Sequence, residues 1–283
     1  MTKKYSIAIM LPTRGRTDVL RRSLFSLIDN ATDMSRVQIM FGFDNDDTVG
    51  IEYFTKTLKP ELDQLKINYT AMSFVPMGYD NINHYGNALA SKSDADWTVF
   101  WNDDAVMHTS GWDQVIADRT GEFKLLAFHT HNDHPYSIFP IVPAKWLELI
   151  GHHSPHQMID AWLSQIAYML DIWERIEVDV THDRHDLTGN NNDATFKGRT
   201  AFEGNPSNPV DFHHISNVIK RMQECETLSI YMKSQGLNTD WWEAVKTRTQ
   251  DPWVKLKEND VNRQMFQFSM SVDNTFNDSI NKK

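Results

Sequence analysis

The stretch that most constrains the fold is a short apolar run that ends abruptly in three polar residues. Residues 97–107 read WTVFWNDDAVM, and the first five are aromatic or β-branched, which favours a buried strand. Unpaired carboxylates are costly inside an apolar core, so Asp103 and Asp104 are expected where this strand leaves the sheet. Ligands bind at that end of the strands in open α/β sheets. A polar turn needs the same residue types, and this stretch alone favours that plainer interpretation.

The polar residues after this strand suit a hard divalent cation. Asn102, Asp103 and Asp104 offer amide and carboxylate oxygens, which are the ligands that Mg²⁺ or Mn²⁺ takes when it carries substrate phosphates. Arg14 and Arg16 lie in the loop after an earlier strand, at the same kind of strand end. They would contact a phosphate or a nucleotide, or they are solvated loop arginines.

Apolar runs and amphipathic segments alternate along the chain and predict an α/β fold. A strand, a glycine-bearing loop and a helix begin the chain, which is the start of a βαβ unit. The alternation continues to residue 181. Further strands are expected at 5–11, 37–43, 67–75, 124–130 and 175–181, and helices from 17 and at 50–65, 80–90, 111–117 and 145–150.

One further helix is expected to carry an acid near its N-terminus. Ser154 suits the N-cap and Pro155 the first helical position, which places Asp160 in the second turn. The helix dipole favours a carboxylate there, and this explanation of Asp160 is as good as a catalytic one. The strand at 175–181 runs directly into His182.

Composition excludes several classes of protein. The chain has 283 residues and 40% hydrophobic content, enough for one large domain or two small ones and too apolar for disorder. No apolar run approaches the roughly 18 residues needed to cross a bilayer, and Pro12 stops the N-terminal run too early for a signal peptide. The one cysteine, Cys225, fits a reducing cytoplasm. A net charge of −10 opposes a broad nucleic-acid footprint but leaves room for a local basic groove.

The chain changes character after residue 182. Residues 183–209 are rich in Gly, Asn, Asp and Pro, and a loop of this length is uncommon unless it is a functional lid or disordered. Helices are expected at 212–233 and 240–247. We therefore expect a catalytic domain over 1–209, with a nucleotide-binding half at 1–110 and an acceptor half with the lid at 111–209. A helical C-terminal extension would occupy 210–283.

Six motifs follow one another in a definite order. They are PTRGR at 12–16 after the first strand, Asp44 at the end of the second, Asn87-Ala88 in the helix before the central strand, FWNDD at 100–104, Asp160 near a helix start, and His182 just past a strand. Over residues 5–185 this order resembles the GT-A-fold glycosyltransferases, most closely the large inverting family that uses nucleotide sugars. The resemblance implies a mostly parallel, Rossmann-like central sheet flanked by helices.

The resemblance also implies a metal-dependent inverting glycosyltransferase with a defined set of site residues. Asp104 and His182 would bind Mn²⁺ or Mg²⁺, and Asp160 would be the catalytic base that takes the proton of a hydroxyl acceptor. In D-x-D terms Asn102 stands at the first acid position, which removes one charge and leaves more of the metal binding to Asp104. The donor, a nucleoside-diphosphate sugar with UDP favoured, would contact Pro12, Thr13, Arg14, Arg16, Asp44, Asn87, Asn102 and Asp103.

Two other functions are compatible with parts of the pattern. A non-catalytic sugar-nucleotide-binding relative would tolerate Asn102, although the presence of both Asp104 and Asp160 speaks against it. A sugar-phosphate nucleotidyltransferase would carry a Gly-rich loop after its first strand, and PTRGR contains one glycine.

The acceptor is left open by the sequence. Glycans, lipid-linked saccharides, proteins, small molecules and modified DNA bases are all acceptors of such enzymes. The acidic balance argues against DNA, but a group of cations with two aromatic residues keeps that acceptor as a hypothesis. The group is Lys197, Arg199, Lys220 and Arg221, with Phe196 and Phe202.

Overall fold

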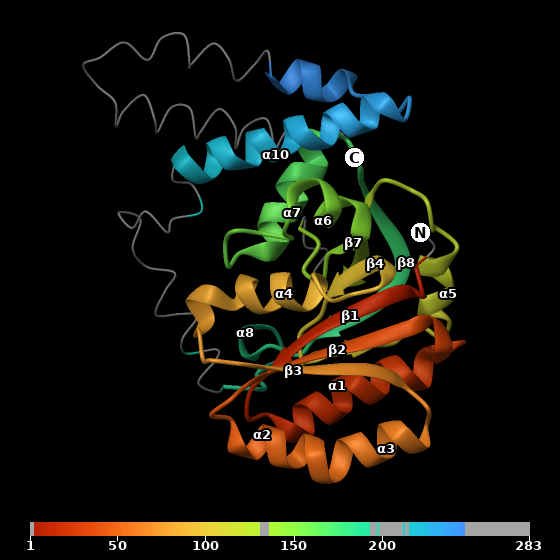
Figure 1. Cartoon of the computed structure of the whole chain (residues 1–283), viewed down its shortest axis with the longest axis vertical. Coiled ribbons are helices and arrows are strands. Elements are labelled where there is room, and N and C mark those ends of the chain that lie inside the picture. The colour runs from red at the N-terminus through yellow and green to blue at the C-terminus, as the bar shows by residue number, and fades with distance from the viewer. Residues whose placement is uncertain (1–2, 131–135, 193–196, 198–211, 213–214, 247–283) are drawn as a thin grey trace, which may run out of the picture.

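An eight-stranded sheet runs through the centre of the protein, with helices on both of its faces (Figure 1). The structure is a computed structural model that describes residues 3–130, 136–192, 197, 212 and 215–246. The strands are β1 (Tyr5–Thr13), β2 (Val37–Asp44), β3 (Asn68–Phe74), β4 (Ala95–Phe100), β5 (Ala105–Met107), β6 (Leu125–Thr130), β7 (Ile141–Pro143) and β8 (Trp173–His182). They lie in the order β3-β2-β1-β4-β7-β6-β8-β5.

The sheet has a parallel half and a mixed half. β1 pairs in parallel with β2 and β4, and β2 with β3, so the carboxyl ends of these strands meet at one edge. In the other half β7 runs antiparallel to β4 and β6, β5 runs antiparallel to β8, and β6 is parallel to β8. The expected α/β fold with a parallel sheet is confirmed for the first half. β5 and β7 have three residues each, which is too short for a periodic pattern to predict their pairing.

Helices separate most of the strands, as the alternating pattern predicts. Those of the first half are α1 (Thr17–Asn30), α2 (Thr48–Tyr53), α3 (Lys59–Gln64) and α4 (Ile82–Ala90). Those of the second half are α5 (Trp112–Ala117), α6 (Ala144–Ile150), α7 (Ile159–Met169), α8 (His185–Thr188) and α10 (Ile215–Ser234). A π-helical turn, Phe54–Leu58, joins α2 to α3, so the helix expected at 50–65 is present with one irregular turn.

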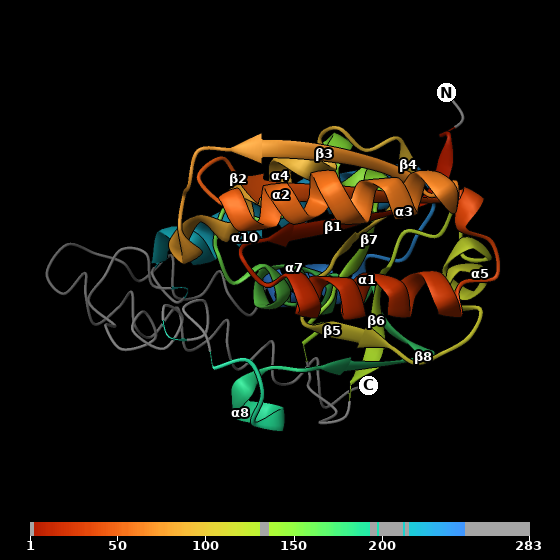
Figure 2. The same cartoon turned by 90° about the horizontal axis from the view of Figure 1, so that it is seen from below.

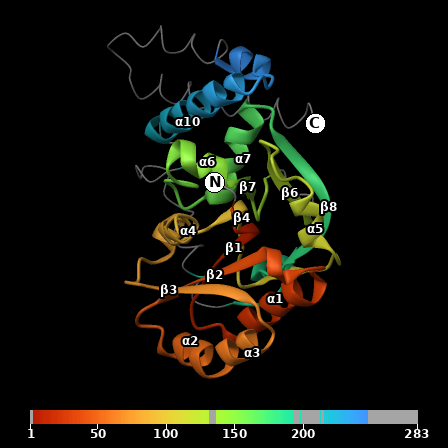
Figure 3. The same cartoon turned by 45° about the vertical axis from the view of Figure 1, so that its right-hand side comes forward.

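Alternate side chains of β1 enter two apolar cores, as expected for a strand that is buried on both faces. Ile7, Ile9 and Leu11 pack in the core under α1, α3 and α5, whereas Ala8 and Met10 pack in the core under α4, α6 and α7. Figures 2 and 3 show α1 to α3 on one side of the sheet and α4, α6 and α7 on the other. Because both faces are covered, an open edge at the strand ends is the natural place for a ligand.

α7 begins later than the sequence predicts. Ser154 does not cap a helix, because its Oγ donates to the His156 carbonyl at 2.7 Å and accepts from the His156 N–H at 3.0 Å. These bonds close a local turn, and the helix begins at Ile159 after Met158 as its N-cap residue. Asp160 therefore lies in the first turn of α7, one turn earlier than expected.

The C-terminal part of the chain is helical where the structure describes it. α10 packs on α6 and α7, and residues 240–246 form a further helical segment (Figure 1). The remainder of the expected extension, and most of the expected lid, lie outside the described residues. None of the helices in the described segments is both long enough and apolar enough to span a membrane.

Candidate metal and nucleotide site

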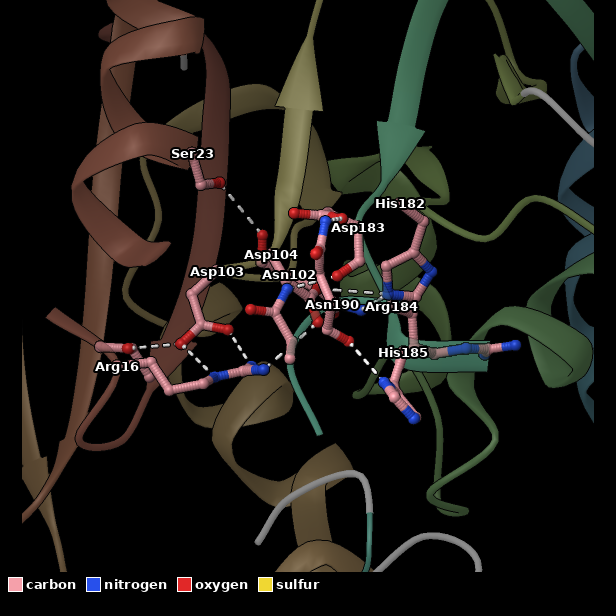
Figure 4. A network of polar contacts seen from close by, with 12 residues as sticks. Arg16, Ser23, Asn102, Asp103, Asp104, His182, Asp183, Arg184, His185 and Asn190 are labelled. Atoms are coloured by element: carbon pink, nitrogen blue, oxygen red, sulfur yellow. Dashed lines mark hydrogen bonds and ion pairs between the residues drawn. The ribbon is translucent and has the colours of Figure 1, made fainter. Parts of the chain in front are cut away.

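Asp104 and His182 lie side by side where β5 begins and β8 ends. Ala105 pairs with His182 in the β5–β8 ladder, and the Asp183 N–H donates to the Asp104 carbonyl at 2.8 Å. These contacts bring Asp104 Oδ1 to 3.2 Å from His182 Nε2 (Figure 4). Their side chains are only 8% and 5% exposed, so solvent screens this pair weakly.

The two facing atoms are both possible metal ligands. Asn102 Nδ2 lies 3.2 Å from His182 Nε2, which accepts its hydrogen bond when the neutral imidazole carries its proton on Nδ1. Within the described part of the chain, Asp104 Oδ1 is buried and accepts no hydrogen bond. Two ligand atoms bound at adjacent positions of a divalent ion, each at about 2.1 Å, stand about 3 Å apart. The Asp104–His182 pair therefore fits a shared cation.

The protein supplies few ligands to such an ion. In the described residues no three His, Cys, Asp or Glu side chains gather closely enough to hold a metal. Mg²⁺ and Mn²⁺ commonly keep several waters and take one or two protein carboxylates together with substrate phosphates. Asp104 and His182 would then form an incomplete site, which a phosphate-bearing substrate would complete.

Arg16 connects the neighbouring acid to the loop after β1. Its guanidinium pairs with both oxygens of Asp103 and lies 3.3 Å from Asp104 Oδ2, and Thr13 Oγ1 donates to Asp103 Oδ2 at 2.6 Å. Burial raises the pKa of the Asp103 carboxyl to about 6, although Arg16 opposes this shift. Burial also raises the pKa of Asp104, but His182 and Arg16 together lower this pKa by more than burial raises it, so the net shift is downward. Asp103 thus fixes the loop, and Asp104 stays ionised and faces His182.

A second polar group surrounds Asp44 at the end of β2. Arg14 donates to Asp44 Oδ2 at 2.6 Å and also pairs with Asp46, while the Tyr85 hydroxyl donates to Asp44 Oδ1. The Met77 N–H donates to the Tyr85 oxygen at 2.9 Å. Burial and then Asp44 raise the pKa of Tyr85 to about 12, so its hydroxyl stays a donor. Pro12 is the second-to-last residue of β1 and pairs with Gly42 near the end of β2.

The Asn87 side chain holds the backbone of the loop before α7. Its Nδ2 donates to the Ser154 carbonyl at 2.7 Å, and its Oδ1 accepts from the His153 and Ser154 N–H groups at 2.9 and 3.2 Å. Both ends of the amide therefore hold the loop that precedes α7. That Asn87 binds the donor stays a prediction.

His153 makes stability depend on pH. Burial, and to a lesser degree the charge of His152, lowers its pKa from 6.5 to about 3, and its Nε2 lies 2.7 Å from Thr98 Oγ1. Between these two values the unfolded chain binds the proton and the folded chain does not, so stability rises with pH across that window. From pH 7 to pH 5 we expect His153 to remove about 2 kcal/mol of unfolding free energy.

Urea unfolding at the two pH values, for wild type and His153→Gln, measures this effect. The glutamine amide can still donate to Thr98 but does not titrate, so the variant should lose about 2 kcal/mol less than wild type on acidification. An identical loss in both proteins would contradict the assignment to His153.

Asp160, the predicted base, makes no described contact with the Asp104–His182 pair. It is partly exposed in the first turn of α7, whose Ile159 packs in the same apolar core as Phe100 at the end of β4. No hydrogen bond or ion pair among the described residues links Asp160 to Asp104 or His182. Its role as a base stays a prediction.

Arg221 is not part of the predicted basic surface. Arg221 is fully buried, with its guanidinium 4.1 Å from the Phe212 ring centroid and 4.8 Å from that of Trp162. It also donates to the Phe212 carbonyl at 3.1 Å. The expectation that Arg221 lies on a nucleic-acid-binding surface is wrong, because aromatic rings cover the cation. Lys197 and Lys220 are exposed, and the remaining members, Arg199, Phe196 and Phe202, lie outside the described residues.

Sequence reasoning missed several residues that shape this region. Ser23 of α1 accepts from Trp101 Nε1 at 2.9 Å and donates to the Asn102 carbonyl at 3.2 Å. No role was predicted for Tyr85, and no partner was predicted for Arg22 or Asp183. Each contact joins segments far apart in the chain, so no local pattern marks it. The nearest signal was the position of Asp183 directly after His182.

Comparison with solved structures identifies the fold. No protein-family model matches the sequence, and no curated protein sequence matches it. A mannosyltransferase from Pyrobaculum calidifontis, in complex with GDP-Man and Mn²⁺, superposes with a TM-score of 0.54 at 9% identity over 97% of this chain and 88% of its own. S. aureus TarS 1–349, in complex with UDP-GlcNAc, gives 0.57 at 10% identity over 97% and 89%. These likenesses establish the GT-A fold that the motif order implies.

Proposed function

We propose that this GT-A-fold protein is a metal-dependent glycosyltransferase that moves a sugar from a nucleoside-diphosphate sugar to a hydroxyl acceptor. The observation that carries the proposal is the buried pair of Asp104 Oδ1 and His182 Nε2, two possible metal-ligand atoms that lie 3.2 Å apart. The similar folds bind GDP-Man with Mn²⁺ in one case and UDP-GlcNAc in the other, which supports a nucleotide sugar as the donor.

The residues around the pair suit the parts of such a donor. Asp104 and His182 would hold the ion, with Asn102 and Asp103 beside it. Pro12 and Thr13 would line the nucleotide from the end of β1, and Arg16 would do so from the loop after it. A divalent ion, when bound, stabilises the negative charge that develops on the departing diphosphate. Arg16 places a second positive charge within 3.3 Å of Asp104, on the same side of the site.

The nucleobase would lie at the end of β2. Asp44 is buried, and each of its oxygens already accepts a hydrogen bond, from Arg14 and from Tyr85. These bonds fix the carboxylate so that its remaining lone pairs can accept from a base N–H. We favour UDP over other diphosphates, and Arg14 would close the pocket from the exposed side.

Asp160 would act as the general base. It would take the proton of the acceptor hydroxyl while that oxygen attacks the anomeric carbon from the face opposite the diphosphate. A single displacement of this kind inverts the anomeric configuration. The position of Asp160 in the first turn of α7, next to the core that holds the end of β4, is compatible with that approach.

Calorimetry followed by a turnover assay tests the proposal. UDP and GDP are titrated with and without Mn²⁺, and a panel of nucleotide sugars is then screened by mass spectrometry for transfer and hydrolysis. We expect diphosphate binding that requires Mn²⁺ and slow hydrolysis of at least one donor. Absence of Mn²⁺-dependent binding to either diphosphate would contradict the function.

Two observations favour a second candidate, a sugar-nucleotide-binding protein without turnover. Asp160 has no contact with the metal pair among the described residues, and Asn102 replaces an acid. The two candidates differ in the response to Asp160→Asn. Loss of turnover with unchanged Mn²⁺·UDP binding indicates the transferase, whereas binding without turnover in wild type indicates the binding protein.

A further inference from the structure

Asp183 is a buried acid outside the proposed ligand set. Its side chain is 7% exposed. Oδ1 accepts from Thr188 Oγ1 at 2.5 Å and from Asn190 Nδ2 at 2.9 Å, and Oδ2 pairs with Arg22 of α1. A buried carboxylate is costly unless several groups satisfy it, and here three side chains from two segments do so. Such an arrangement fixes the position of the backbone that carries it.

The backbone of Asp183 lies next to both proposed metal ligands, Asp104 and His182. Asp183 directly follows His182, and its N–H donates to the Asp104 carbonyl at 2.8 Å. The Asn191 side chain donates to the Asp183 carbonyl. The residue therefore joins the segment of one proposed ligand to the segment of the other (Figure 4).

α1 also holds the segment that follows β4. Ser23, the residue after Arg22, donates to the Asn102 carbonyl and accepts from Trp101 at the end of β4. One turn of α1 thus contacts the chain just before Asp104 through Ser23 and just after His182 through Arg22. The helix spans both segments from which the ligands come.

We propose that Arg22 and Asp183 form a brace between α1 and the end of β8 that positions His182 against Asp104 and sets the affinity for the divalent ion. The inference rests on the proposed function, because it requires a metal at this pair. Arg22 and Asp183 are positioning residues and do not touch the ion. Groups that orient metal ligands typically change metal affinity by about 10- to 100-fold when they are replaced.

Titration of the full-length protein with Mn²⁺ in the presence of UDP tests the brace, with free Mn²⁺ followed by its EPR signal. Asp183→Asn and Arg22→Met should each weaken Mn²⁺ binding by about 10-fold. The double variant should bind no more weakly than the weaker single variant, because both changes break one contact. Arg21→Met is the matched control, since Arg21 lies on the same helix but pairs with Glu61, and its affinity should match wild type.

Thr188→Val keeps the test decisive if Asp183→Asn does not fold. It removes one donor to Asp183 and leaves Arg22 in place, so a smaller loss of Mn²⁺ affinity is expected. Folded variants of Arg22, Asp183 and Thr188 with wild-type affinity would overturn the brace while leaving the proposed function intact. Wild-type protein that binds no Mn²⁺ with UDP would overturn both.

Discussion

Asp104→Asn should lower donor turnover by about 1000-fold, which corresponds to about 4 kcal/mol of transition-state stabilisation. The amide keeps the size of the side chain but removes the charge that would hold the cation. Asp104 Oδ1 faces His182 Nε2 at 3.2 Å, whereas both oxygens of the adjacent Asp103 pair with Arg16, so Asp103 is not positioned to replace it. The variant should also lose Mn²⁺-dependent UDP binding in calorimetry, while its far-UV circular dichroism stays that of wild type.

The matched control for this change is Asp118→Asn. Asp118 follows α5 and accepts from Gln114 on an exposed surface, so the same chemical change there should leave turnover within twofold. Turnover of Asp104→Asn within tenfold of wild type would contradict the role given to this carboxylate.

Arg16→Met should destabilise the fold by about 3 kcal/mol, more than any other surface-facing arginine of α1 or its entry loop. The Arg16 side chain is 17% exposed and pairs with carboxylates that are 2% and 8% exposed. Replacing Arg16 by methionine leaves Asp103 and Asp104 buried without the guanidinium that pairs with them. Urea unfolding at pH 7 measures the loss, and Mn²⁺ should restore part of it by supplying charge beside Asp104.

Arg21→Met provides the comparison for this prediction. Arg21 pairs with Glu61, and both side chains are more than a third exposed, so the pair contributes about 0–1 kcal/mol. Equal destabilisation by the two methionine variants, or a loss in Arg16→Met that Mn²⁺ deepens, would show that Arg16 does not neutralise the acid pair.

The placement of the acids could be predicted from the sequence because it follows from a local cost. An apolar run such as 97–101 can be followed by Asp103 and Asp104 only where the strand has ended and a cation pairs with the acids, and here Arg16 pairs with both. The same argument placed Asp44 at the end of β2, and both predictions agree with the structure. The fold class followed from the alternation of buried strands with amphipathic helices.

The partners of these acids could not be predicted in the same way. The fork of Arg16 across two carboxylates, and the bond from Tyr85 to Asp44, join residues that are distant in the chain and depend on the register of the whole sheet. β5 is three residues long, yet its pairing with β8 is what brings His182 to Asp104. The start of α7 was misplaced because a serine that can cap a helix can equally close its own turn, as Ser154 does.

Pulsed EPR of the Mn²⁺·UDP complex shows whether Asp104 and His182 share one divalent ion. We expect a nitrogen hyperfine coupling from an imidazole bound to Mn²⁺ in wild type. The coupling should disappear in a folded His182→Gln variant that still binds Mn²⁺·UDP with lower affinity. A wild-type complex without nitrogen coupling, or a coupling that persists in His182→Gln, would contradict a shared ion.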